Sequence, residues 1–79
     1  MNEREAQHEL DATGLYCPEP VMLLHKVMRT AAPGDLDAVR ATDPTTSRDI
    51  PQFCHFLGHA LLDERESDGE LYFLLRKAP

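Results

Sequence analysis

The chain has 79 residues, with eight basic and fourteen acidic side chains and a formal charge of −6 at pH 7. This length allows one domain over residues 1–79, with residues 1–6 expected to fray, and a hydrophobic content of 42% is enough for a core. The negative charge opposes direct binding of nucleic acid, whose phosphates require basic partners. No apolar run approaches the roughly 20 residues of a membrane span, and the charged N-terminus does not resemble a signal peptide. We therefore expect a cytoplasmic protein that binds other proteins.

The first half of the chain predicts a strand, a helix and a second strand. Weak alternation over 8–12 favours a short strand, which Gly14 ends. A helix is expected from Pro18 to Ala32, stopped by Pro33 and Gly34. Its apolar side carries Val21, Leu24, Val27, Met28 and Ala31, and its polar side carries Met22, His25, Lys26 and Arg29. The second strand, over 35–42, is the weakest element because its alternation is irregular.

The second half predicts a helix followed by a hairpin. The helix is expected over 48–59, with Pro51 tolerated near its first turn and with His55 and His59 facing outward. Strands over 61–66 and 70–77 flank Asp68-Gly69, a pair suited to a tight turn. Two helices and about four strands fit an α+β fold, a two-layer sandwich with both helices on one face of a mixed sheet.

Cys17 is the main candidate for chemistry. Pro18 suits the first helical position and Pro20 stiffens the same turn, so Cys17 is expected at the positive end of the helix dipole. That position favours a thiolate, the reactive form in sulfur exchange. Exchange needs no neighbouring base, and His25 lies too far along the helix to be a good one. The competing interpretation is a buried structural cysteine, which we favour for Cys54.

Three other features suggest weaker functional interpretations. Met22, Lys26 and Arg29 form either an ordinary solvated face or a docking surface beside Cys17. His55 and His59, four residues apart, could hold a metal only weakly, because no third ligand is apparent. A disulfide between the two cysteines is not expected in a reducing compartment. We therefore predict no metal and no cofactor.

Two segments resemble one family. Residues 10–20 read LDATGLYCPEP, and residues 43–54 read DPTTSRDIPQFC. Both are similar to signatures of the TusA (SirA-like) sulfur carrier proteins, and they resemble the branch that serves tRNA thiolation. The resemblance extends from about Leu10 to Lys77 and implies a β-α-β-α-β-β fold. It also implies a persulfide on Cys17, supported by Pro18, Glu19 and Pro20. Asp37 departs from the family pattern, where an apolar strand residue is usual.

The same resemblance implies the partners. An IscS-like cysteine desulfurase would load the sulfur, and a TusBCD-like complex would receive it for 2-thiolation of the wobble uridine of tRNA. The carrier would be consumed and reloaded, unlike a multi-turnover enzyme, and is expected to be a monomer when free. Two alternatives stay open at this point. One is a redox-sensing regulatory module, and the other is delivery of sulfur or selenium in another pathway.

Overall fold

The computed structural model describes residues 6–79. The elements follow the order β1 (His8–Ala12), α1 (Glu19–Thr30), β2 (Leu36–Ala41), α2 (Thr46–Leu57), β3 (Ala60–Ser67) and β4 (Glu70–Arg76). This order confirms the one predicted from the sequence. The expected fraying of residues 1–6 falls, except for Ala6, outside the described residues.

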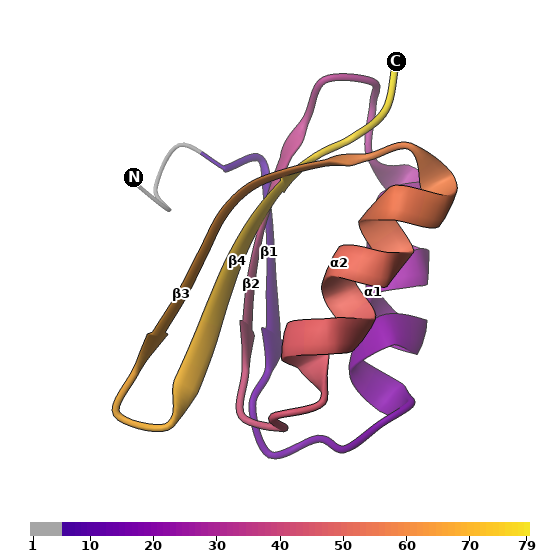
Figure 1. Cartoon of the computed structure of the whole chain (residues 1–79). Helices are drawn as coiled ribbons and strands as arrows, with labels where there is room; N and C mark the ends of the chain where they lie inside the picture. Colours follow the sequence, from indigo (N-terminus) through magenta and orange to yellow (C-terminus); the bar gives the residue numbers. More distant parts are fainter. Residues whose placement is uncertain (1–5) are drawn as a thin grey trace.

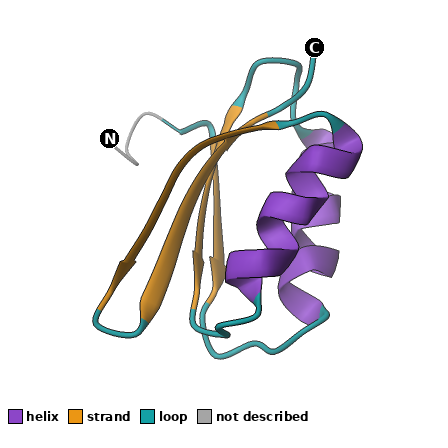
Figure 2. Cartoon of the chain, in the orientation of Figure 1, coloured by secondary structure: helices purple, strands orange, loops and turns teal. Residues whose placement is uncertain are grey.

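The four strands form one mixed sheet in the order β1-β2-β4-β3. The first two strands are parallel, and the other two pairings are antiparallel. Both helices cover the same face of the sheet (Figures 1 and 2). The predicted two-layer α+β sandwich is therefore confirmed. No helix within residues 6–79 is long and apolar enough to cross a membrane.

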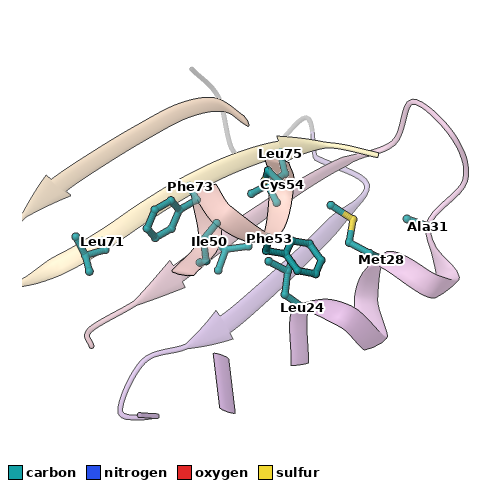
Figure 3. Packing of buried hydrophobic residues seen from close by; sticks show 10 residues of the cluster. Leu24, Met28, Ala31, Ile50, Phe53, Cys54, Leu71, Phe73 and Leu75 are labelled. Atoms are coloured by element: carbon teal, nitrogen blue, oxygen red, sulfur yellow. The ribbon is translucent and has the colours of Figure 1, made fainter. Parts of the chain in front are cut away.

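The core lies between the helices and the sheet. It draws on the apolar stripes of both helices and on alternate residues of β4, as Figure 3 shows, together with Val39 of β2. Its buried members are Leu24, Met28, Ala31, Val39, Ile50, Phe53, Cys54, Leu71, Phe73 and Leu75. Cys54 is 3% exposed, which confirms that it packs as a small apolar side chain.

Asp37 lies in this core layer, although it is charged. It pairs with His8 of β1 and Leu75 of β4, in the same register that places Val39 opposite Leu10 and Phe73. Asp37 is 1% exposed, and neither carboxylate oxygen has a hydrogen-bond partner among the described residues. Burial raises the pKa of this carboxyl above its ordinary value. The register of the second strand is thus regular, and Asp37 is an unfavourable residue within it.

Both helix starts differ from the predictions. The first helix begins at Glu19, and Pro18 occupies the cap position that precedes it. The second begins at Thr46, two residues earlier than predicted, so Pro51 lies inside the helix and beyond its first turn. The earlier start of α2 follows from the polar groups before it, because the Thr46 hydroxyl donates to the Asp43 carbonyl at 2.7 Å.

The end of α2 overturns one prediction. Gly58 adopts a left-handed conformation (φ +77°) and caps the helix, so His59 lies beyond it. His59 is half-buried: its Nδ1 accepts a hydrogen bond from the Ala78 N–H at 2.9 Å, and its ring lies 5.6 Å from that of Phe53. The expectation that His59 faces outward beside His55 on one helix was therefore wrong.

Candidate functional site

The site forms where two loops meet at the end of the sheet at which β1 and β2 finish. Because β1 and β2 are parallel, the loops that lead from them into α1 and α2 emerge at the same end (Figure 1). The Gly14 N–H in the first loop donates to the Thr42 hydroxyl in the second at 2.9 Å. The two segments that resemble the family signatures are therefore neighbours in space.

Asp43 joins the cysteine loop to the start of α2. One carboxylate oxygen accepts the Cys17 N–H at 2.7 Å, and the other accepts the Thr45 N–H at 3.0 Å. These bonds hold the pKa of Asp43 below its ordinary value, because they favour the charged form. Asp43 is 7% exposed, so its carboxylate is largely withdrawn from solvent. The backbone of Cys17 is thus fixed by a residue 26 positions away in the sequence.

The Cys17 side chain is exposed close to the start of α1. The peptide bond between Cys17 and Pro18 is cis. Pro20 is buried in the first turn, whereas Glu19 is exposed. The Glu19 N–H donates to the Tyr16 carbonyl at 2.9 Å and closes the turn around the cysteine. Cys17 is therefore exposed on a turn whose backbone is held by two hydrogen bonds, one to Asp43 and one between Glu19 and Tyr16.

An open groove of about 330 Å³ runs from Cys17 between the two helices. Val21 of α1 and Phe53, Phe56 and Leu57 of α2 line it, and Phe56 is 81% exposed. His25 lines the same groove, but its ring packs edge-on against Phe53 with the centroids 4.7 Å apart. The Cys17 sulfur thus borders an apolar surface that a partner could cover.

The protonation of Cys17 differs from the prediction. Asp49 of α2 lines the groove with Cys17, and hydrogen bonding to its carboxylate raises the pKa of the thiol above its ordinary value. The negative charge of Asp43 acts in the same direction, and Arg48 opposes it. Partial burial of the thiol also raises its pKa, so the direction is opposite to the lowered pKa that the helix-dipole argument predicted.

The remaining candidates either do not line the groove or are buried. Met22, Lys26 and Arg29 are all exposed on α1, and Met22 is 59% exposed. Burial raises the pKa of Cys54 to about 11, which makes it a poor nucleophile. Within residues 6–79, no group of three or more metal-binding side chains comes together. Of the predicted site residues, Cys17 and Pro18 line the groove together with residues of the second motif.

The sequence reasoning missed Asp43, Asp49 and Phe56 as parts of the site. Asp43 carried a usable signal, since an aspartate before Pro-Thr-Thr is typical of a helix start. Asp49 and Phe56 flank the apolar stripe of α2, but only the packing of the two helices shows that they face Cys17.

Comparison with known proteins identifies the family. The model of the family described as "Sulfurtransferase TusA" matches residues 8–77. Sulfur carrier proteins TusA from Pseudomonas paraeruginosa and Pseudomonas putida are 59% identical over 68 residues, covering 86% of this chain and 86% and 85% of theirs. A SirA-like protein from Desulfitobacterium hafniense has the same fold, with a TM-score of 0.80 at 19% identity over 92% of this chain and all of its own. With these matches across nearly the whole chain, the protein belongs to the TusA sulfurtransferase family.

Proposed function

We propose that the protein carries sulfur as a persulfide on Cys17. The observation that carries this proposal is an exposed thiol fixed at the start of α1 by Asp43, at the end of an apolar groove. The sulfane sulfur of a donor persulfide is attacked by Cys17 Sγ, and the donor sulfur leaves as a thiol. The names of the relatives support this activity, since they are sulfur carrier proteins.

Replacement of Cys17 by serine tests the proposal. The protein is incubated with a cysteine desulfurase and cysteine, and its intact mass is recorded. We expect wild-type protein and Cys54→Ser to gain the mass of one sulfur atom, and Cys17→Ser to gain none. Sulfur uptake by Cys17→Ser would overturn the proposal, because Cys54 is buried and its thiol pKa is about 11.

The proposed partners follow from the family. An IscS-like desulfurase serves as donor and a TusBCD-like complex as acceptor, and the sulfur ends as the 2-thio group of the wobble uridine in tRNA. The carrier acts in the cytoplasm, is a monomer when free, and does not itself bind the tRNA. The net charge of −6 supports the last point.

Lys26 and Arg29 are proposed to contribute to partner docking together with Met22. All three are exposed on one stripe of α1, at spacings of four and three residues. Reversal of both charges (Lys26→Glu with Arg29→Glu) is expected to slow association with the donor or acceptor about tenfold at low salt, without unfolding the domain.

Stopped-flow transfer rates at several salt concentrations measure this effect. The matched control reverses two exposed arginines on the sheet, Arg65→Glu with Arg76→Glu, which changes the net charge equally. Equal rates in the α1 variant and the control would show that only overall charge matters and would contradict a docking role.

A further inference from the structure

The groove beside Cys17 adjoins a second pocket, of about 300 Å³, which we call the basic pocket. Its walls are the end of α1, Leu57 of α2, His59 and residues 77–79. His25 and Leu57 line both the groove and the basic pocket. The open surface beside Cys17 therefore continues along the helices towards the ends of α1 and α2.

The walls of the basic pocket contain no aspartate or glutamate. Arg29 and Lys77 line it together with the titratable His25 and His59. Pro79 also lines it, but within residues 6–79 its terminal carboxylate forms no ion pair with any of these side chains. Arg29 has no ion-pair partner in that part of the chain either. Three other arginines each pair with a carboxylate: Arg40, Arg48 and Arg65.

Contacts between α1, His59 and the C-terminal segment fix the walls of the pocket. Lys77 Nζ donates to the Met28 carbonyl, and the Ala78 N–H donates to His59 Nδ1 at 2.9 Å. Because Nδ1 accepts, the proton of the neutral ring is on Nε2, which has no partner among residues 6–79. The ammonium group of Lys77 also has N–H donors to spare. The pocket therefore combines fixed N–H donors with the unpaired charge of Arg29.

The length of α1 sets the spacing between the basic pocket and Cys17. Arg29 follows Glu19, the first residue of α1, by ten positions, which is about 15 Å at the usual helical rise. An extended chain covers that distance in about five residues. Phe56 and Leu57, 81% and 46% exposed, line the groove between them and offer apolar contacts. A segment that reaches both places needs a cysteine, an apolar side chain and, about five residues from the cysteine, an anionic group.

We propose that the basic pocket binds a carboxylate side chain of the sulfur donor, about five residues from the donor's reactive cysteine. Among protein side chains, a carboxylate is the acceptor that best matches guanidinium, ammonium and imidazole N–H donors. The net charge of −6 opposes acidic partners at long range, so this pocket recognises a single acidic residue and not an acidic surface.

This proposal rests on the proposed function, because it takes Cys17 Sγ as the atom that the donor must reach. It alters no bond-making step of the sulfur exchange. Arg29, His59 and Lys77 orient the donor segment, and they do not touch the sulfur atoms that react.

A competition between two peptides tests the pocket. The peptides are acetyl-Cys-Ser-Leu-Ser-Ser-X-amide, with X as Glu or Gln and with different isotope labels. Each enters as a mixed disulfide with 2-mercaptoethanol, and exchange with the Cys17 thiol of the full chain releases 2-mercaptoethanol. At physiological ionic strength, where distant charges are screened, we expect about three times more Glu adduct than Gln adduct by intact mass. A peptide with Glu directly after the cysteine should show no preference, because it does not reach Arg29.

A reversal of charge in the pocket should reverse the preference. Arg29→Glu is expected to favour a peptide with X as Lys over the Glu peptide. The matched control is Arg76→Glu, which makes the same charge change at an exposed residue of β4 that lines neither the groove nor the pocket. The control should keep the wild-type preference, and circular dichroism confirms that both variants are folded. Equal Glu and Gln adducts on wild-type protein would overturn the proposal, as would the same change in both variants.

Sulfur loading by a cysteine desulfurase, measured in parallel, separates this proposal from the proposed function. Arg29→Glu should be loaded about three times more slowly than Arg76→Glu. If wild-type protein takes up no sulfur but still prefers the Glu peptide, sulfur carriage fails and the carboxylate site stands. If wild-type protein is loaded on Cys17 but prefers neither peptide, the proposal alone is overturned. Equal loading of both variants, with slower transfer from Arg29→Glu to an acceptor, would assign the pocket to the acceptor and contradict the donor.

Discussion

Asp43→Ala is expected to lower the melting temperature by about 10 °C, because it removes two charge-assisted hydrogen bonds from a small domain. The Cys17 and Thr45 N–H groups lose their acceptor, and the methyl group of alanine cannot replace it. The variant should also take up sulfur more slowly, because the loop that presents Cys17 is no longer joined to α2. Thermal unfolding followed by circular dichroism measures the first effect.

The effect of Asp43→Ala should depend on pH. The pKa of Asp43 is lowered in the folded protein, so its contribution to stability is present above the ordinary carboxylate range near about 4. That contribution is lost as the pH falls through the folded-state pKa. Wild-type protein and Asp43→Ala should therefore converge in stability in acid.

Asp43→Asn provides the matched control. Its amide oxygen can still accept one of the two N–H groups, so its melting temperature should fall between those of wild-type protein and Asp43→Ala. If Asp43→Ala melts within a degree or two of wild-type protein near neutral pH, Asp43 does not hold the two loops together, and the account of the site is wrong at that residue.

The second large effect is a gain in stability. Asp37→Val is expected to raise the free energy of unfolding by about 1–3 kcal/mol near neutral pH, because it replaces a buried charge that has no hydrogen-bond partner. Valine is close in size and suits a strand. His8 and Lys77 offset part of the charge of Asp37, but neither donates a hydrogen bond to it. Urea unfolding curves give the difference.

The pH dependence again follows from the pKa. The folded-state pKa of Asp37 is raised, so the protonated carboxyl is tolerated in acid, and stability falls as the pH rises from the unfolded-state value, about 4, through the folded-state value. The advantage of Asp37→Val over wild-type protein should therefore shrink in acid. Asp37→Asn, which removes the charge but keeps an unpartnered polar group, should gain less. A loss of stability in Asp37→Val would mean that the carboxylate has a favourable partner in solution.

Much of the fold could be predicted because local patterns agree with the tertiary structure. The apolar stripe from Val21 to Ala31 has a helical period, and the hairpin has Asp68-Gly69 at its turn, with Asp68 at φ +53° and Gly69 at φ +80°. The helix ends were harder. The end of α2 had a usable signal in Gly58, but the apolar pattern continued through Ala60 and favoured a longer helix.

The site was predicted only in part, because its chemistry depends on contacts across the sequence. Cys17 and its prolines form a local motif that can be recognised in the chain. The groups that set the protonation of Cys17 are 26 and 32 residues away, on a segment that reaches the cysteine only because β1 and β2 are parallel neighbours. The helix-dipole argument therefore gave the wrong direction for the pKa. Asp43 and Asp49 lie outside residues 10–20, so the local motif around Cys17 could not indicate their effect on its thiol.

The most direct test of sulfur carriage follows one labelled sulfur atom through a complete cycle. Wild-type protein is loaded by a desulfurase with isotopically labelled cysteine, purified away from donor and cysteine, and mixed with a TusBCD-like acceptor. We predict that the label is on the Cys17 peptide before mixing, and that it leaves the carrier and is found on the acceptor afterwards. A label that stays on Cys17, or that is found on Cys54, would contradict the account.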